Sequence, residues 1–577
     1  MACREEMLSN DYMEILLDYA QPYIDESFPI SCYEVIDDQF VVLLVERNLL
    51  PPISISSLTY TAIPKLYGLM QETPVPEVTP MQNFNSLSLV KSGILQVQRP
   101  PLSLTGRGVA IGFVDTGIRY DLPVFRREDG TSRILAIWDQ TIQDGTPPEG
   151  FSYGTLYTNE QINEALQSDD PLSIVPSTDT IGHGTSMASV AAGSNVNSGL
   201  TFLGAAPDAD IVVVKCREAK QYLRDYYFIP EGVPAYSATD IAMAVKYLDS
   251  FAIVGSRPVV ICIGLGTNWG DHAGNSILAR YLNRIAQKRS RVVIVCGGNE
   301  GNAEHHYGSS VTMSSRSVVE VVEVRVAEEE VGFVMELWGS PPNLFSVSIR
   351  SPGGEVIPAI DFRSRTTRNF SFIYERTKVT VDHVLVEQGT GEEIVVFRFE
   401  VPTPGVWTFN ITIEGDSDYS DINLWLPITQ FLKGNTHFLR STPYTTLTEP
   451  SMAQYVITPS TYDDSNDSFY IESGRGFVRG REAKPDFAAP GVNVSTVLGE
   501  QTGSSISAAI TAGGSAQFMQ WAVVEGNDPL VQTTQIKTYF IRGARRNSDT
   551  LYPNRSWGYG QLDLERTFAI IAGTVGG

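Results

Sequence analysis

The chain has 577 residues, of which 42% are hydrophobic and 19% charged, the composition of a globular protein with room for two or three domains. Its formal net charge of −24 leaves no basic surface to neutralise nucleic-acid phosphates or to bind an anionic membrane. We therefore expect neither nucleic acid nor membrane as a partner.

The cysteines and the N-terminus indicate a reducing compartment. The five cysteines are widely spaced, and Cys262 and Cys296 lie in apolar runs typical of buried small side chains. We expect no disulfide framework, no metal site and no cofactor. The opening residues, MACREEMLSNDYMEILLDYA, mix charges with apolar side chains, unlike a signal peptide. Synthesis in the cytoplasm follows as the expectation.

Residues 1–95 mix short helical and strand patterns, which predicts an α+β N-terminal domain with a linker. DYMEILLDYA has helical spacing, whereas QFVVLLVE is typical of a strand. The stretch MQETPVPEVTPMQNFNS at 70–86 is rich in proline and threonine, which predicts a solvated linker.

Residues 96–316 alternate apolar strands with helical stretches. The strands are GVAIGFVDTGI (108–118), ADIVVVKC (209–216), RPVVICIGLG (257–266) and RVVIVCGGNEG (291–301). ATDIAMAVKYLDSFA and SILARYLNRIAQK lie between them and have helical spacing. This pattern predicts a parallel α/β sheet with helices on both faces.

Residues 317–437 consist of short alternating strands separated by Gly and Pro turns, such as SVVEVVEVRV and EIVVFRFEVPTPGVWTFNITIEG. They predict an antiparallel sandwich or jelly roll inserted into the chain. The α/β pattern returns in residues 438–577. The insertion therefore interrupts one α/β domain, and we expect it to brace that domain.

Three polar residues could form a catalytic unit. Asp115 ends an apolar strand, where parallel α/β sheets place their chemistry. His183 lies between glycines in TIGHGTSMASVAAG, and Ser505 begins a helical stretch in TGSSISAAITAGG. A Gly-Ser-Ser tripeptide alone is more often a turn or a helix start. With a base and a carboxylate in the same chain, Ser505 becomes a candidate nucleophile, His183 its base and Asp115 the group that orients the imidazole. Asp, His and Ser follow the chain order of the subtilisin triad.

An oxyanion also needs hydrogen-bond donors. Ser505 at a helix start leaves its backbone N–H free to donate. Asn299, in the loop after a buried strand, can supply a side-chain amide.

These motifs resemble the subtilases, a family of serine proteases. The matching segments are VDTG at Asp115, GHGTSMA at His183, GGNEG at Asn299 and GSSISAA at Ser505, supported by KPDFAAPGVNV at 484–494. PKLYGL, SGILQVQ and RILAIWDQTI resemble more narrowly the clostridial Csp germination proteases. The resemblance implies a subtilisin-like fold over about residues 100–316 and 440–570.

The resemblance also implies roles outside the catalytic unit. Residues 1–95 would be a prodomain that assists folding, is cut between Leu69 and about Ser86, and stays bound. Gly264, Leu265 and Gly266 would pair with the substrate backbone. The protein substrate would be the precursor of a spore cortex-lytic enzyme, with the protease packaged in the spore.

Two departures from the family pattern stand out. Gly503-Ser504-Ser505 replaces Gly-Thr-Ser, a change that retains the hydroxyl. Gly264 replaces the usual serine, which leaves side-chain preference beside the cut bond undefined.

Other interpretations remain open from the sequence. Some Csp relatives are pseudoproteases, so a regulatory protein that senses a germinant such as a bile salt is one alternative. A general intracellular peptidase is another. The complete Asp-His-Ser set favours an enzyme. The adjacent histidines of EHHYG, which begins at Glu304, lack metal-ligand spacing and predict a surface loop. His272 is expected to shape a loop beside the substrate.

Overall fold

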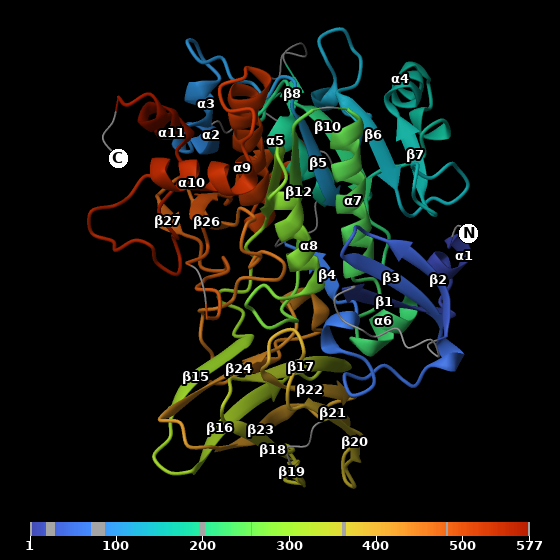
Figure 1. Ribbon diagram of the computed structural model, residues 1–577, viewed down its shortest axis with the longest axis vertical. Coiled ribbons are helices and arrows are strands. Elements are labelled where there is room, and N and C mark those ends of the chain that lie inside the picture. Colours follow the sequence, from blue (N-terminus) through green and yellow to red (C-terminus); the bar gives the residue numbers. More distant parts are fainter. Residues whose placement is uncertain are drawn as a thin grey trace.

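The computed structural model describes residues 3–18, 29–70, 87–195, 202–255, 257–360, 365–480 and 483–574. An α/β body occupies the top of Figure 1 and a β body, residues 306–438, the bottom. An N-terminal segment, residues 3–70, lies beside both, and its last strand, β4, reaches the centre of the molecule (Figure 1).

The α/β body is built on a sheet with the strand order β14-β12-β5-β10-β6-β7. Neighbouring strands are parallel except for β7, which runs antiparallel to β6. The strands are β5 (Ala110–Asp115), β6 (Ile134–Asp139), β7 (Thr155–Thr158), β10 (Asp210–Lys215), β12 (Val259–Ile263) and β14 (Arg291–Val295).

Helices cover both faces of this sheet, as predicted. Ile111 and Phe113 of β5 join a core with α5 and α9, whereas Ala110 and Val114 join a core with α7 and α8. Because successive side chains point to opposite faces, burial on both faces accounts for the uninterrupted apolar runs. The covering helices are α5 (His183–Ala192), α7 (Ala238–Val254), α8 (Ile277–Ala286) and α9 (Ser504–Met519).

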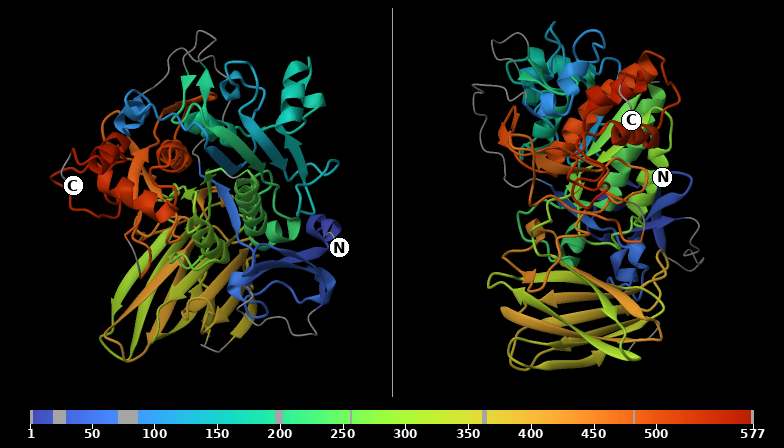
Figure 2. Two further views of the ribbon diagram at one scale, coloured as in Figure 1. Left: turned by 45° about the horizontal axis from the view of Figure 1, so that its top comes forward. Right: turned by 90° about the vertical axis from the view of Figure 1, so that its left-hand side faces the viewer.

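The β body consists of two antiparallel sheets, in the orders β15-β24-β17-β22-β21-β20 and β19-β18-β23-β16-β25. The sheets lie face to face as a sandwich (Figure 2), and residues such as Phe397 and Phe409 form a core between them. The antiparallel class agrees with the prediction, and a jelly-roll topology stays a prediction. Its strands are β15 (His306–Thr312), β16 (Ser317–Val326), β17 (Gly332–Gly339), β18 (Leu344–Arg350), β19 (Val356–Ile360), β20 (Arg365–Ser371), β21 (Lys378–Val384), β22 (Glu393–Glu400), β23 (Gly405–Glu414), β24 (Tyr419–Trp425) and β25 (His437–Phe438).

The N-terminal segment contains an antiparallel sheet in the order β1-β3-β2 after a short helix. The helix predicted from DYMEILLDYA is wrong, because Tyr12–Asp18 forms strand β1 and pairs along its whole length with β3. Six of its seven residues are buried, which removes the alternation that would have marked it as a strand. The elements are α1 (Arg4–Leu8), β1 (Tyr12–Asp18), β2 (Ile30–Val35), β3 (Phe40–Glu46) and β4 (Leu66–Leu69).

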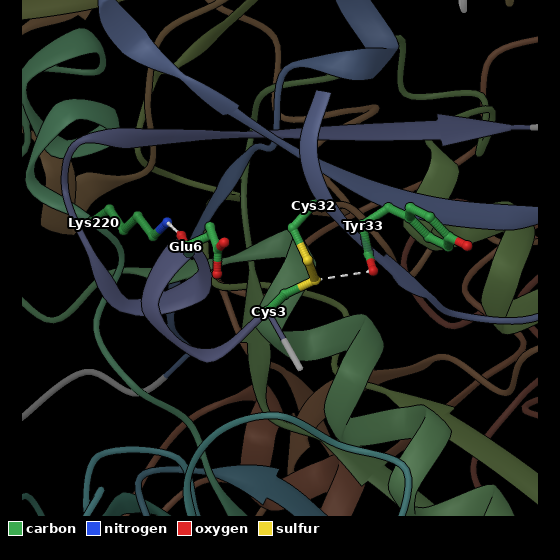
Figure 3. The surroundings of a disulfide bond; sticks show 5 residues. All are labelled: Cys3, Glu6, Cys32, Tyr33 and Lys220. Atoms are coloured by element: carbon green, nitrogen blue, oxygen red, sulfur yellow. Dashed lines mark hydrogen bonds between the residues drawn. A yellow bond between two sulfur atoms is a disulfide. The ribbon is translucent and has the colours of Figure 1, made fainter. Parts of the chain in front are cut away.

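Cys3 and Cys32 form a disulfide, contrary to the expectation that no cysteines pair (Figure 3). The start of the chain packs against β2, which brings their Cα atoms within 5.8 Å although 29 residues separate them. No local spacing signals such a pair, since the tertiary fold alone brings the two residues together. Cys262 and Cys296 are buried thiols, as expected, and Cys216 is buried as well.

Shorter elements complete the description. They are α2 (Leu87–Lys91), α3 (Ile94–Val97), α4 (Asn159–Gln167), β8 (Ser194–Asn195), β9 (Phe202–Leu203), α6 (Gln221–Tyr226), β11 (Tyr236–Ser237), β13 (Leu265–Gly266), β26 (Pro459–Asp463), β27 (Ser468–Phe469), β28 (Phe487–Pro490), β29 (Val494–Thr496), β30 (Gly499–Gln501), α10 (Thr533–Gly543) and α11 (Leu564–Ile571). Within the described ranges, the helices are too short or too polar to cross a bilayer. The predicted linker, apart from Met70, lies outside the described residues.

Candidate active site

Asp115 and His183 meet at the carboxyl end of β5. Asp115 is the last residue of that strand and His183 is the first residue of α5. Oδ1 of Asp115 lies 2.7 Å from Nδ1 of His183, and both side chains are 1% exposed. The N–H of Thr116 donates to the same carboxylate oxygen at 2.7 Å, which fixes the carboxylate beside the imidazole. This geometry suits a carboxylate that orients a base.

Ser505 lies at the start of α9, the helix that packs beside α5. Its side chain is buried, and its Oγ has no hydrogen-bond partner among the described residues. The same holds for Nε2 of His183, the imidazole nitrogen that does not face Asp115. These two atoms are the ones between which a proton would pass in nucleophilic catalysis.

The loop that carries Asn299 is fastened to the start of α9. The N–H of Ser504 donates to Oδ1 of Asn299 at 3.0 Å, and the N–H of Gly298 donates to Oγ of Ser504 at 3.0 Å. The hydroxyl retained at position 504 therefore has a structural use. Because Oδ1 of Asn299 faces the helix, its Nδ2 donor lies on the other side of the amide.

Strand β4 of the N-terminal segment lies in this site, between β11 and β13. Leu69 pairs with Leu265, and Gly68 pairs with Gly266. All three residues predicted to bind substrate, Gly264, Leu265 and Gly266, therefore line one edge of a bound strand.

Met70 brings this strand to the nucleophile. Its N–H donates to the carbonyl of Gly264 at 3.2 Å, and its own carbonyl accepts from the N–H of Ser505 at 3.4 Å. The carbonyl group of Met70 thus lies at the N-terminus of α9, where backbone N–H groups favour negative charge.

Packing explains why glycine replaces serine at position 264. A Cβ on Gly264 would lie 2.5 Å from Sδ of Met187, 2.7 Å from Oδ2 of Asp115 and 2.8 Å from Cε1 of His183. At these distances a side chain at position 264 would require Met187, Asp115 or His183 to shift.

Thr448 is a site residue that the sequence analysis missed. A Cβ on Gly266 would touch Thr448 and would lie 3.3 Å from Sδ of Met70, so both side chains lie beside Gly266. Oγ1 of Thr448 is buried without a hydrogen-bond partner in the described part of the chain. No motif marks Thr448, because its neighbours Gly266 and Gly298 lie far from it in the sequence.

The histidines set aside in the sequence have structural roles. The surface loop expected for EHHYG is wrong, since His305 and His306 are both buried. His306 and His272 stack on Trp425, with ring centroids 4.5 and 4.0 Å away. Burial lowers the pKa of His306 to about 4 and that of His272 to about 3, so both imidazoles are neutral at pH 7. Across the described residues, no three His, Cys, Asp or Glu side chains gather as metal ligands.

Comparison with known proteins agrees with this geometry. The model of the subtilase family matches residues 106–560, a range that holds Asp115, His183, Asn299 and Ser505. The chain belongs to the subtilase family of serine peptidases.

Two known proteins are similar to this subtilase. The subtilisin-like protease SBT1.9 of Arabidopsis thaliana is 30% identical over 133 residues, which cover 20% of this chain and 17% of that protein. The chain thus spans less than a fifth of that relative's length. The structure of the CspB protease of Clostridium perfringens superposes with a TM-score of 0.75 and 29% identity, covering 84% of this chain and 98% of that one. The predicted subtilisin-like fold is confirmed.

Proposed function

We propose that this subtilase is a serine endopeptidase that first cuts its own chain after Met70. The supporting observation is the hydrogen bond from the N–H of Ser505 to the carbonyl of Met70, on a strand held as a substrate would be. The N-terminal segment then acts as a prodomain, and Met70 falls within the stretch predicted to be cut, Leu69 to about Ser86.

The reaction assigns one role to each group. Oγ of Ser505 attacks the carbonyl carbon of Met70 while Nε2 of His183 takes its proton, and Asp115 stabilises the resulting imidazolium. The backbone N–H of Ser505 and the amide of Asn299 donate to the oxyanion. The C–N bond to Gln71 breaks, its amine leaves with the proton from His183, and water then hydrolyses the acyl-enzyme.

Buried charges support a prodomain that stays bound after the cut. The guanidinium of Arg217 donates to Glu14 of β1 at 2.9 Å and to Asp240 of α7 at 2.9 Å, and all three side chains are buried. Separating the N-terminal segment from the α/β body would break the Arg217–Glu14 pair and the pairing of β4 with β11 and β13. The cut strand would therefore remain in the cleft and restrain the mature enzyme.

We propose the precursor of a spore cortex-lytic enzyme as the protein substrate, activated by limited proteolysis. This step rests on the motifs shared with the Csp germination proteases and on the similarity to CspB. It would place the enzyme in the spore after synthesis in the cytoplasm.

Self-cleavage is tested by comparing the wild type with Ser505→Ala. The wild type should give two fragments on a denaturing gel, the smaller ending at Met70 by mass spectrometry, that elute together in size exclusion. Ser505→Ala should remain one chain. A wild type that stays intact and cuts nothing when folded would instead favour a regulatory role for this scaffold.

The substrate is tested separately with a purified cortex-lytic precursor. Wild-type enzyme should produce one new pair of fragments, and Ser505→Ala should produce none. A precursor that survives a self-processed enzyme freed of its prodomain would remove the assigned substrate and leave the peptidase activity in place.

A further inference from the structure

We propose that a loop of the β body selects the protein substrate by requiring glycine at the third residue before the cut bond. This clamp loop, residues 428–431, lies between β24 and β25 and contacts the bound strand at Leu69. The inference rests on the proposed function, since it treats β4 as a substrate-like strand.

The clamp loop holds the bound strand through Gln430. The N–H of Leu69 donates to Oε1 of Gln430 at 3.1 Å, and Nε2 of Gln430 donates to the carbonyl of Leu69 at 2.6 Å. One side chain thereby makes both bonds that a neighbouring strand would make. Strand β11 pairs with Leu66 and Tyr67 only, so Gln430 continues that edge toward the cut bond.

The clamp loop also leaves no room for a side chain at position 68. A Cβ on Gly68 would lie 2.5 Å from Cδ1 of Ile428, 3.1 Å from Oε1 of Gln430 and 3.3 Å from Cζ of Phe431. Gly68 does not have a positive φ, so its backbone conformation is open to alanine. Limited space, and not backbone strain, therefore disfavours a side chain here.

The side chains of Ile428 and Phe431 form a wall beside Gly68, and surrounding residues hold this wall in place. Ile428 and Phe431 are each 1% exposed, and Phe431 stacks on Trp269 with ring centroids 5.4 Å apart. Both the N–H and the hydroxyl of Thr429 donate to Glu300 at 3.0 Å. Glu300 directly follows Asn299, so the clamp loop is tied to the loop that carries the oxyanion donor. A substrate side chain at this position would have to displace packed groups.

The preferred substrate is accordingly a protein segment that enters as an extended strand with glycine two residues before the residue that supplies the cut carbonyl. Gln430 recognises the backbone of the intervening residue and is indifferent to its side chain. The inserted β body is thus a part of the substrate-binding cleft and selects what is cut.

The test uses the full chain and its own cleavage. Pulse-labelled protein made by cell-free translation is followed on denaturing gels for the wild type, Gly68→Ala, Ile428→Ala and the double variant. Gly68→Ala should cut about 100-fold more slowly than the wild type. Ile428→Ala removes packing from the clamp loop and should also cut more slowly than the wild type, but by a smaller factor. The double variant should cut itself at least about tenfold faster than Gly68→Ala. Exposed Gly255, also without a positive φ and with no atom closer than 3.1 Å to its added Cβ, provides the matched control Gly255→Ala.

Each outcome decides between the proposals. A wild type that never cuts removes the proposed function. If the wild type cuts and Gly68→Ala cuts equally fast, the proposed requirement for glycine at position 68 is wrong, and the proposed function stands. If Gly68→Ala fails to fold, the double variant decides, because removing the Ile428 side chain should relieve the clash and restore both folding and cutting. A double variant that neither folds nor cuts better than Gly68→Ala would overturn the proposed glycine requirement.

Gln430 is tested by its own pair of variants. Gln430→Ala should slow self-cleavage about tenfold, and Gln430→Glu by at least as much, since a carboxylate would face the carbonyl of Leu69. The control is Gln167→Ala, an exposed glutamine of α4. Wild-type rates for both Gln430 variants would show that the clamp loop does not bind the strand.

Discussion

The two edges of the bound strand are held in different ways. One edge is the backbone of Gly264, Leu265 and Gly266, which belongs to the α/β body and continues from β12. The other edge is shared between β11 and the clamp loop of the β body. The first edge presents backbone and glycine, and the second presents the side chains of Ile428 and Gln430.

The two edges therefore have different roles: the first binds the strand, and the second selects which strands can bind. Backbone pairing is independent of sequence, so the first edge can align any extended segment with Ser505. The second edge adds steric exclusion at one position, which discriminates among segments. The insertion thus supplies a selective contact that the α/β body lacks.

The largest effect should come from Asn299, the proposed side-chain donor to the oxyanion. Asn299→Ala should slow self-cleavage by about 10² to 10³, because it removes a hydrogen bond that forms in the transition state. Asn299→Asp retains an acceptor for the N–H of Ser504 but has no amide donor, so it should cut no faster than Asn299→Ala. Rates are measured on pulse-labelled chains, with exposed Asn302→Ala as the control. An unchanged rate with a lower thermal midpoint would mean that Asn299 serves only its own loop.

The first edge itself should tolerate no side chain. Gly264→Ala should slow self-cleavage about 10²-fold, since its Cβ would displace the imidazole of His183 or the carboxylate of Asp115. The cut should still follow Met70, as the second edge is unaltered. A Gly264→Ala chain that cuts as fast as the wild type would show that Met187 absorbs the added methyl group.

The sequence allowed the first edge to be predicted and not the second. Asp115, His183 and Ser505 each lie at the end of a strand or the start of a helix, in short segments with a recognisable pattern. Gly264 to Gly266 follow such a strand directly. Local signals of this kind survive in a single sequence because the chemistry and the turn use the same few residues.

Other features depend on contacts between distant parts of the chain. Gln430 lies in an insertion and meets Leu69 across 361 residues, so no spacing could connect them. For the same reason, no sequence signal reveals the Cys3–Cys32 disulfide or the site residue Thr448. Strand β1 was mistaken for a helix because burial on both faces erased its alternation. Prediction failed where tertiary packing, and not local pattern, assigns the role.

A smaller effect should follow from loosening the tie between the clamp loop and the oxyanion loop. Glu300→Gln keeps the shape of a side chain that also lies 2.6 Å from Nδ1 of His305, but weakens its charge-assisted bonds to Thr429. Self-cleavage should slow by about three- to tenfold, with the same cut site. The rate in Gly68→Ala should change less, because its strand is already misplaced. Equal slowing in both backgrounds would argue that Glu300 acts on the whole α/β body instead.

The smallest effect should appear in stability and not in cutting. Glu449 lies on the far side of the first edge, where its backbone pairs with Thr267, and Oε2 accepts from Ser276 at 3.0 Å. Burial, and then the charge of Asp271, raises the pKa of Glu449 to about 8. The folded protein thus keeps a proton that the unfolded chain releases near its ordinary pKa of 4.5.

Stability from this group is therefore full below pH 4.5 and is lost as the pH rises through 8. Glu449→Gln stays neutral and still accepts from Ser276. In the uncut Ser505→Ala background it should raise the thermal midpoint by about 2 °C or more at pH 8 and leave it nearly unchanged at pH 5. Equal midpoints at pH 8 would show that Glu449 ionises in the folded protein much as it does in water. Because the first edge binds through backbone alone, the rate of self-cleavage at pH 7 should remain that of the wild type.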